Sequence, residues 1–447
     1  MNVSINRRDF INAGAAGLTA TLTGGLSLAE AETRKVRLGF VGLGGQGTGL
    51  LRMCLDMDDV EVPALSEIKP DRLQRAVDLV VKSGRKEPEG YSGEEDFRKL
   101  CERSDLDGVI VATPWLWHTP MCVTAMKARK YVAPEVWGAS SLEECWELVK
   151  ASEESGMPCM MLENHCYERT PMAVLKMVRA GIFGELVHGE CGYCHDLRAL
   201  KFEPPDARYG PGARGEGEWR TEHSIKRNGD LYPTHGLGPI ANCMDINRGN
   251  RMVTLTSTPT DSNSLHEFIV RQVGPDHPSA KLEIKLADIV TTVVKCQNGE
   301  TIIIKHDTNL PRPYTSNYLV QGTKAVWMEH RDLVSSIYID EVSPAHKWET
   351  IDKYLEEWEH PMWQKFLKGG VKGGHGGADW LKARSFVECV KRRIPTPIDV
   401  YDTAAWISVS PLSEESITKG SAPVDFPDFT GGMWMKRKPI FGLSADY

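Results

Sequence analysis

The stretch Val36-Arg37-Leu38-Gly39-Phe40-Val41-Gly42-Leu43-Gly44-Gly45-Gln46-Gly47 joins an apolar run to a glycine-rich turn. A second apolar run spans residues 60–65, and the acid Glu67 follows it, 20 residues after Gly47. Glycines in such a turn permit a tight bend between a strand and a helix and let a pyrophosphate approach the backbone N–H groups. An acid at the tip of the second strand accepts the hydroxyls of a ribose. The pattern predicts a dinucleotide site formed by Gly42, Gly44, Gly45, Gln46, Gly47 and Glu67.

The charge of Glu67 also indicates which dinucleotide binds. A carboxylate at this position repels the 2′-phosphate of NADP, so NAD is the expected cofactor. Lys69 and Arg72 follow closely in the sequence and weaken that preference.

The first half of the chain alternates between two kinds of segment. Up to residue 162, helical segments, one opened by a capping box at Ser141 and Glu144, separate apolar runs at 36–41, 60–65, 108–112, 131–133 and 159–162. Such alternation builds a parallel sheet covered by helices on both faces. We therefore expect an α/β protein whose residues 33–165 form an NAD-binding Rossmann domain with a doubly wound parallel sheet.

Beyond Pro171 the pattern changes. After a helix at 171–180, alternating runs predict strands at 186–193, 252–257, 289–296, 301–306, 318–321, 325–329 and 335–339. Further helices are expected at 354–367, 379–391 and 401–419, and the Gly/Pro-rich segment 204–217 reads as a surface or site loop. Residues 166–447 should thus form an α+β domain with a mostly antiparallel, open-faced sheet for substrate binding and oligomerisation. An exposed sheet face favours a homo-oligomer, a dimer or larger.

The N-terminal residues resemble an export signal. Asn6-Arg7-Arg8-Asp9-Phe10 precedes an uncharged stretch at 11–29 that ends in small residues around Ala29 and Ala31. This is typical of a twin-arginine signal peptide over 1–31, which predicts a periplasmic or secreted protein beginning near Thr33. An anchoring transmembrane helix is the alternative for this stretch. Because this route exports folded proteins to a place without an NAD pool, a bound nucleotide would have to be regenerated within each catalytic cycle.

Composition is that of a globular protein and narrows the range of partners. The chain has 447 residues, of which 26% are charged and 41% hydrophobic. A net charge of -8 argues against nucleic acid as a partner, and no later segment is apolar enough to span a membrane. The 11 cysteines read as small buried hydrophobes, and the histidines show no metal-ligand spacing. The expected partner is a small-molecule or glycan substrate.

Several longer strings carry a family resemblance. The order of glycine turn, Glu67, Ala112-Thr113-Pro114 and Glu135 resembles the Gfo/Idh/MocA oxidoreductase superfamily. Four strings are similar to glycoside hydrolase family 109: Thr113-Pro114-Trp115-Leu116-Trp117-His118, Glu163-Asn164-His165-Cys166-Tyr167, Asn228-Gly229-Asp230-Leu231-Tyr232-Pro233-Thr234-His235-Gly236-Leu237-Gly238-Pro239 and Gly374-His375-Gly376-Gly377. The activity named for that family is α-N-acetylgalactosaminidase.

The resemblance implies a cofactor site, a sugar site and a mechanism. The cofactor residues would be Gly45, Gln46, Glu67, Trp115, Leu116, Trp117, His118, Glu135, Val136 and Asn164. The sugar residues would be Tyr193, Arg220, Tyr232, Pro233, Thr234, His235 and Tyr314. The implied reaction on a terminal N-acetylgalactosaminide is transient NAD-dependent oxidation at C3, elimination across C1 and C2, addition of water and re-reduction. It requires no carboxylate pair flanking the glycosidic bond.

One departure from the superfamily separates glycosidase from dehydrogenase. The superfamily's dehydrogenases usually carry Glu-Lys-Pro where this chain has Glu135-Val136-Trp137. That lysine helps to move the hydroxyl proton during hydride transfer, and valine cannot. The substitution weighs against a simple sugar dehydrogenase.

Tyr193 and His235 are the predicted catalytic acid–base pair. Histidine titrates near neutrality, and a tyrosinate can be reached beside a cation. Glu135 and Tyr167 are second choices. Each residue also has a structural interpretation: Tyr193 as a packed strand residue, Arg220 as a loop ion pair, and Trp115 and Trp117 as core aromatics. Glycine and proline neighbours place His235 in an exposed turn.

Three further interpretations remain open. Cys191-Gly192-Tyr193-Cys194-His195 matches a covalent haem motif, although it lies inside a predicted strand. A periplasmic sugar oxidoreductase with a tightly held nucleotide, like glucose–fructose oxidoreductase, would produce oxidised and reduced sugars rather than hydrolysis alone. A non-catalytic sugar-binding protein on the same fold would bind without turnover.

Overall fold

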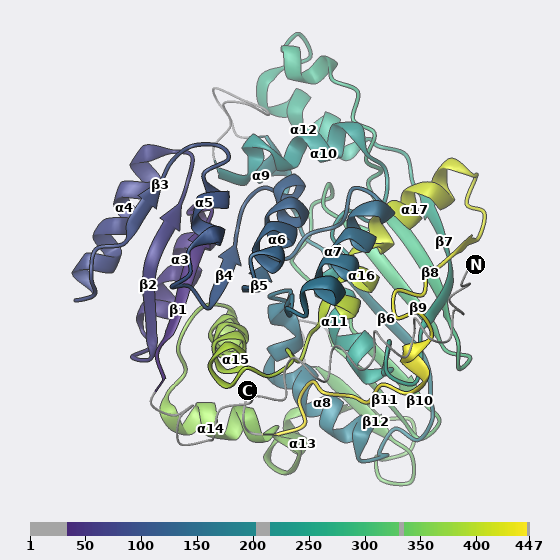
Figure 1. Ribbon diagram of the computed structural model, residues 1–447. Helices are drawn as coiled ribbons and strands as arrows, with labels where there is room; N and C mark the ends of the chain where they lie inside the picture. The colour runs from purple at the N-terminus through teal and green to yellow at the C-terminus, as the bar shows by residue number, and fades with distance from the viewer. Residues whose placement is uncertain (1–33, 203–214, 330–334, 445–447) are drawn as a thin grey trace, which may run out of the picture.

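The computed structural model describes residues 34–202, 215–329 and 335–444, which form two domains in close contact (Figure 1). The predicted signal peptide at 1–31 and most of the predicted loop at 204–217 lie outside the described residues. Among the described helices, none has the length and apolar character needed to cross a membrane.

The N-terminal domain is a five-stranded parallel sheet. Its strands are β1 (Val36–Val41), β2 (Val60–Ser66), β3 (Glu89–Tyr91), β4 (Gly108–Val111) and β5 (Tyr131–Pro134), in the order β3-β2-β1-β4-β5. The connecting helices are α3 (Gly45–Leu55), α4 (Pro70–Lys82), α5 (Phe97–Glu102), α6 (His118–Lys127) and α7 (Leu142–Ser155). β4 and β5 are buried throughout, as strands of a parallel sheet between helices must be. The predicted doubly wound parallel sheet is confirmed.

Two details of this sheet differ from the prediction. The short strand β3 was not predicted, because its residues are mostly exposed and lack an apolar run. The strand expected at 159–162 is wrong: only Cys159 forms a bridge, with Val132 of β5. The segment still follows β5, since the N–H groups of Met160 and Leu162 donate to the carbonyls of Val132 and Pro134, both at 2.9 Å.

The C-terminal domain contains a nine-stranded mixed sheet. Its strands are β6 (Leu186–Cys194), β7 (Met252–Pro259), β8 (Val290–Cys296), β9 (Thr301–Asp307), β10 (Leu319–Gly322), β11 (Ala325–Met328), β12 (Ser336–Ile339), β13 (Glu349–Thr350) and β14 (Val424–Asp425), in the order β13-β12-β11-β10-β6-β9-β8-β7-β14. β6 and β9 pair in parallel, and the other described neighbours are antiparallel. The mostly antiparallel sheet is thus confirmed.

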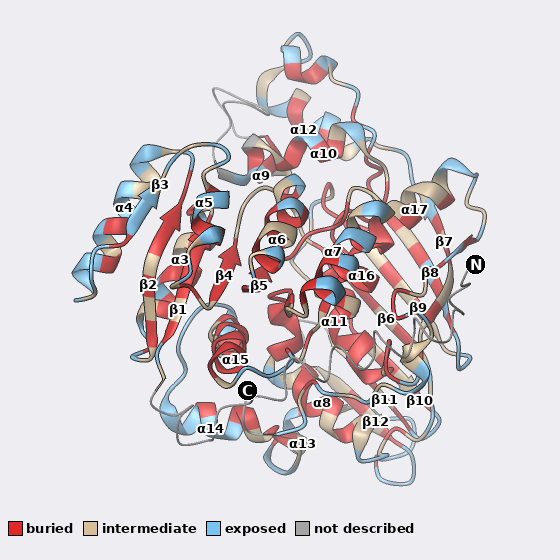
Figure 2. Cartoon of the chain, in the orientation of Figure 1, coloured by how far each residue is buried: buried red, intermediate tan, exposed pale blue. Residues whose placement is uncertain are grey.

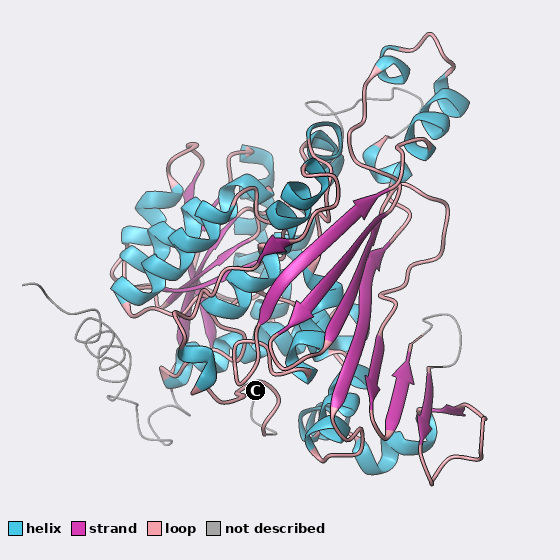
Figure 3. Ribbon diagram, turned by 90° about the vertical axis from the view of Figure 1, so that its right-hand side faces the viewer, coloured by secondary structure: helices cyan, strands magenta, loops and turns pink. Residues whose placement is uncertain are grey.

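One face of this sheet carries the helices and the other faces outward (Figure 3). Along β8, Thr292, Val294 and Cys296 are buried while Val293 and Lys295 between them are exposed. This period of two is that of a sheet packed on one side only. Figure 2 shows buried residues where the sheet meets α11 (Thr234–Cys243) and α17 (Val409–Thr418), and along α16 (Val400–Ile407), which packs against α11 and α7.

Two predicted helices are each divided in the structure. The helix expected at 354–367 is α13 (Asp352–Trp358) followed by α14 (Pro361–Gly369), because Pro361 cannot continue a helix but suits a first helical turn. The helix expected at 401–419 is α16 and α17, which meet at Ser408. The predicted helix at 171–180 is α8 (Arg169–Arg179).

A small lobe stands apart from the sheet (Figure 3). It comprises α9 (Arg198–Lys201), α10 (Arg220–Lys226) and α12 (Ser264–Val273). Phe202, Leu265 and Ile269 form a separate hydrophobic cluster here.

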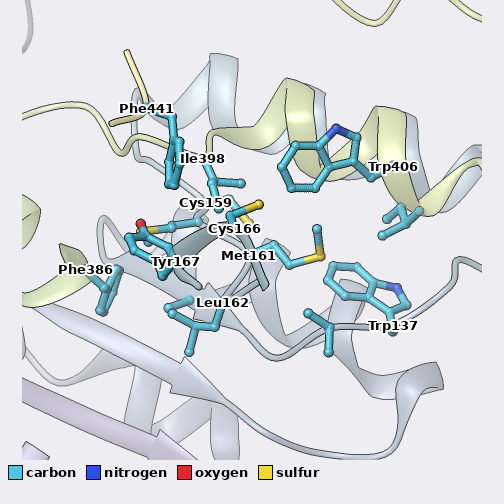
Figure 4. Packing of buried hydrophobic residues seen from close by; sticks show 14 of the residues in the cluster. Trp137, Cys159, Met161, Leu162, Cys166, Tyr167, Phe386, Ile398, Trp406 and Phe441 are labelled. Carbon is cyan, nitrogen blue, oxygen red and sulfur yellow. The ribbon is translucent and has the colours of Figure 1, made fainter. Parts of the chain in front are cut away.

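Helix α15 (Ala378–Arg392) connects the two halves, since it belongs to the C-terminal part of the chain and packs on the N-terminal domain. Arg384 donates to both carboxylate oxygens of Asp59, at 2.6 and 2.8 Å, and Lys391 donates to Asp59 at 2.7 Å. Phe386 is fully buried (Figure 4). All 11 cysteines are buried and none forms a disulfide, as expected of small core residues.

Candidate active site

The glycine turn after β1 forms a close approach to the backbone. Gly42 has a positive φ of 85°, and a Cβ there would lie 2.6 Å from the carbonyl oxygen of Ala112. A Cβ on Gly47 would lie 2.0 Å from the carbonyl oxygen of Gly42, so this glycine lets α3 pack on the turn. Gly45, the first residue of α3, has open space at its Cβ position. The turn therefore offers free N–H groups of a helix start to a phosphate.

Glu67 is held against this turn at the end of β2. Its Oε2 accepts the N–H of Leu43 at 2.7 Å, and its Oε1 accepts the N–H of Lys69 at 3.0 Å. The carboxylate still lines the cavity described next, together with Lys69 and Arg72. Its remaining lone pairs can accept ribose hydroxyls. These residues therefore fit a dinucleotide such as NAD.

One cavity of about 530 Å³ joins the glycine turn to the start of α11 and to β6. The predicted cofactor residues along it are Gly42, Gly44, Gly45, Gln46, Glu67, Trp115, Trp117, His118, Glu135, Val136 and Asn164. The predicted sugar residues along it are Tyr193, Arg220, Tyr232 and His235. The two predicted sites are thus adjacent parts of one cavity.

The remaining predicted residues are not among the described residues that line the cavity. Gly47 packs inside the turn, and Leu116, the middle residue of the 3-10 turn Trp115–Trp117, has an exposed side chain. Pro233 precedes α11 and Thr234 is its buried first residue. Tyr314 lies beside Tyr193, with ring centroids 5.9 Å apart.

Arg220 forms the centre of an aromatic wall. Its guanidinium lies 4.6 Å from the ring centroid of Tyr232, 5.1 Å from that of Trp115 and 5.7 Å from that of Tyr193. Arg220 is only 8% exposed and donates to Glu216 at 2.6 Å. These cation–π contacts hold a desolvated charge beside the residues that were predicted to bind the sugar.

Tyr193 is a protonated phenol in this environment. Burial raises its pKa, and although the charge of Arg220 acts in the opposite direction, burial prevails. Its hydroxyl lies 3.1 Å from Nδ1 of His195. Tyr193 can therefore donate a hydrogen bond at neutral pH, whereas the sequence suggested a readily formed tyrosinate.

His235 differs from Tyr193, because its environment favours the form that can accept a proton. The prediction of an exposed turn is wrong, because His235 is the second residue of α11 and its side chain is 13% exposed. Burial and the nearby cations, Lys382 and His375 foremost, hold the pKa of His235 well below its ordinary value. Its Nδ1 lies 2.8 Å from Oε1 of Glu163. His235 is therefore neutral and can accept a proton.

Glu135 is paired with a lysine that sequence reasoning missed. Lys382 of α15 is 1% exposed and donates to Oε1 of Glu135 at 2.8 Å, where Gln46 also donates at 3.0 Å. Burial alone would lower the pKa of Lys382, but Glu135 and Asp379 outweigh it and raise that pKa. The chain therefore places a lysine near Val136 after all, from a helix about 250 positions later.

A second histidine–carboxylate pair lies at the rim of the cavity. Nδ1 of His375 donates to Oδ2 of Asp379 at 2.7 Å, and this hydrogen bond raises the pKa of His375. The side chain is 53% exposed. His375 has a positive φ of 47°, in a loop where Gly373, Gly376 and Gly377 also have positive φ. The sequence signals for this site were the family-like string Gly374-His375-Gly376-Gly377 and the four-residue spacing from His375 to Asp379.

The structure also places Tyr167, a second choice as catalytic residue, and the two cysteines of the haem-like motif. Tyr167 is fully buried, and its hydroxyl donates to Ser385 at 3.0 Å within the packed region of Figure 4. Cys191 and Cys194 of the haem-like motif are buried thiols of β6. Among the described residues, no group of three or more His, Cys, Asp or Glu side chains is placed to hold a metal ion.

Two family models match the chain, one over the domain with the glycine turn and one over the domain with His235 and His375. The C-terminal domain of glycosyl hydrolase 109 matches residues 167–436, and the oxidoreductase family with an NAD-binding Rossmann fold matches residues 36–163. The chain belongs to glycosyl hydrolase family 109. This confirms the resemblance seen in the sequence and makes the protein a glycoside hydrolase built on an NAD-binding Rossmann domain.

Relatives of the family 109 protein align with it almost end to end. A glycosyl hydrolase family 109 protein of Stenotrophomonas maltophilia (strain K279a) is 46% identical, with 99% of this chain and 100% of the relative aligned. An alpha-N-acetylgalactosaminidase of Tannerella forsythia is 44% identical, with 91% of this chain and 89% of the relative aligned.

Solved structures similar to the family 109 chain are more distant. Levoglucosan dehydrogenase in complex with NADH and levoglucosan has a TM-score of 0.65 at 18% identity, covering 88% of this chain and 100% of its own. An inositol dehydrogenase homolog from Azotobacter vinelandii, complexed with NADH and myo-inositol, has a TM-score of 0.63 at 16% identity, covering 88% and 98%. These likenesses show the shared fold.

The packing of Gly47 predicts the effect of a single methyl group. Gly47→Ala should distort the turn, destabilise the protein by about 1–3 kcal/mol and abolish tight nucleotide binding. Melting temperature and the NAD released on denaturing the purified protein measure both effects. Gly49→Ala is the matched control, because its Cβ meets no atom within 4 Å. Wild-type NAD content in Gly47→Ala would contradict the prediction.

Proposed function

We propose that the protein hydrolyses terminal N-acetylgalactosaminides by transient oxidation at C3, elimination across C1 and C2, addition of water and re-reduction. The observation that carries the proposal is the single cavity in which a dinucleotide turn adjoins a neutral histidine and a tyrosine. NAD, when bound, supplies a reversible hydride acceptor for C3. Gly42, Gly44, Gly45, Glu67 and Asn164 would hold it.

His235 is the proton acceptor of this proposal. A ketone at C3 acidifies the proton on C2, which a base must remove. A neutral imidazole can take a proton, and burial beside cations keeps His235 in that form. Tyr193, whose ring centroid lies 5.6 Å from that of His235, and Arg220 beside it donate to the C3 oxygen as it becomes negative.

His375 is the proton donor to the leaving group. Its environment moves its pKa in the direction opposite to that of His235, and such divergence is how one site separates an acid from a base. Its place at the rim of the cavity, more than half exposed, suits contact with the departing aglycone.

Export by the twin-arginine route is part of the proposal. Arg7-Arg8 and the uncharged stretch after them support it. Replacing both arginines by lysine should leave the protein in the cytoplasm, as cell fractionation would show.

We also propose that the protein is a homo-oligomer, because one face of the second sheet is directed outward and not covered by helices. Light scattering should then give at least twice the mass of the monomer.

Isotope exchange tests the redox route. In deuterated water and without added NAD, an aryl α-N-acetylgalactosaminide should yield product with deuterium at C2, seen by mass spectrometry or NMR. His235→Ala should lower both exchange and hydrolysis by about 10²–10⁴-fold. Hydrolysis with the C2 proton fully retained would exclude the mechanism. Oxidised and reduced sugars without hydrolysis would instead identify an oxidoreductase, and binding without turnover a sugar-binding protein.

The identity of the leaving group tests His375. His375→Asn should lower the rate for an alkyl glycoside by about 10²-fold or more, but much less for a 4-nitrophenyl glycoside, whose leaving group needs little protonation. His266→Asn, at an exposed position of α12, is the control. Equal losses on both substrates would remove the assignment.

The pairing of His375 with Asp379 also sets a pH dependence. Because Asp379 raises the pKa of His375, the protonated acid persists to higher pH, and activity on the alkyl glycoside falls as pH rises through that pKa. Asp379→Asn should move this alkaline limb to lower pH. Lys382, Glu168 and His235 also face His375 and are unchanged in the variant. A limb that stays in place in the kcat/KM profile would contradict the assignment.

A further inference from the structure

Glu163 lies at the start of the turn η2 (Asn164–Tyr167), immediately behind His235. Its side chain caps that turn, since Oε1 accepts the N–H of His165 at 3.0 Å. The same oxygen lies 2.8 Å from Nδ1 of His235. Glu163 is fully buried, and Met161, Leu162, Cys166 and Tyr167 on either side of it belong to the hydrophobic core (Figure 4). The carboxylate is therefore fixed in place by the core.

The hydrogen bonds at Glu163 determine where the shared proton lies. Burial raises the pKa of Glu163, which favours the neutral acid, whereas the charge and N–H of His165 favour the carboxylate. The hydroxyl of Thr234, the residue before His235, also bonds to the Glu163 side chain and favours the carboxylate. A carboxylate that accepts two N–H groups at Oε1 satisfies both donors. The proton between the two residues thus belongs to Nδ1 of His235.

His165 restrains the same imidazole from its face. The two rings lie 4.1 Å apart between centroids with an interplanar angle of 36°. His165 is itself buried, with Nδ1 3.3 Å from a carboxylate oxygen of Glu168 and Nε2 3.2 Å from the hydroxyl of Tyr314. Between Glu163 and His165, Asn164 lines the nucleotide part of the cavity.

We propose that Glu163 is a positioning residue that holds His235 in the Nδ1-protonated tautomer, so that Nε2 presents its lone pair to the sugar, while His165 fixes the plane of the ring. The inference rests on the proposed role of His235 as base. Nε2 takes a proton from the sugar, and the electron pair of the broken bond stays on the sugar. The imidazolium that forms is balanced by the Glu163 carboxylate, which remains ionised.

A double-mutant cycle in the full-length holoenzyme tests the proposal. Glu163→Gln removes the charge and can offer its amide N–H to Nδ1, which favours the wrong tautomer, so kcat should fall about 10²-fold or more. Added to His235→Ala, the same substitution should cause no further loss, because Glu163 acts through His235. Glu163→Asp, which keeps the charge, should recover part of the rate. Glu349→Gln is the control and should keep full activity, because this carboxylate of β13 pairs with Lys353 and Tyr354 away from the cavity.

Proton NMR provides a readout that is independent of turnover. The buried Nδ1–H between His235 and Glu163 should give a strongly downfield resonance in the wild type and in Glu349→Gln. It should be lost in Glu163→Gln and in His235→Ala, and its presence in the wild type can be tested even if a variant fails to fold.

The outcomes separate this inference from the proposed function. Full activity of Glu163→Gln, an equal further loss in the His235→Ala background, or no downfield resonance assignable to His235 would overturn the positioning role. A protein that shows the resonance but neither hydrolyses glycosides nor exchanges the C2 proton would refute the glycosidase assignment and leave the tautomer established.

Discussion

The docking of α15 on the N-terminal domain is the interaction on which the site depends. Lys382 is buried between Glu135 of one domain and Asp379 of its own helix, and an unpaired charge at that depth would be strongly destabilising. The ion pairs of Arg384 and Lys391 with Asp59 fix the same helix farther along. Because His375 immediately precedes α15, this docking also sets the distance between the rim of the cavity and the glycine turn.

The same arrangement of charges gives two histidines opposite properties. Both histidines have a carboxylate partner, but burial and the nearby cations lower the pKa of His235, whereas the more exposed His375 has its pKa raised by Asp379. Neither behaviour is intrinsic to the residue type. Moving Lys382 would change the electrostatic environment of His235, His375 and Glu135 at once, so the two histidines and the nucleotide side of the cavity are electrostatically linked.

Local patterns in the sequence predicted most strands and helices, but they did not predict which side chains form hydrogen bonds with one another at the site. The glycine turn, Glu67 and the alternation of runs predicted the Rossmann sheet and most of the second sheet, because their signals lie within a few residues. Hydrophobic periodicity did not predict the break between α13 and α14 at Pro361 or the single bridge at Cys159. Both depend on backbone hydrogen bonding at one residue, which a pattern over many residues does not reveal. The pairs Glu163–His235 and Lys382–Glu135 became visible only when the fold brought together positions 72 and 247 residues apart, and no spacing rule could report that. Asp379 lies only four residues after His375, a helical spacing that the sequence did contain.

The lobe of α9, α10 and α12 has its own small core, and through Arg220 it supplies one wall of the cavity beside Tyr232. Mutations in that core would tilt the wall without disturbing the parallel sheet, the η2 turn or α15. Selection can therefore reshape which glycans enter while leaving the chemical steps intact, in the way that loops diversify enzymes on a conserved scaffold. Descendants of this protein would be expected to differ first at the lobe.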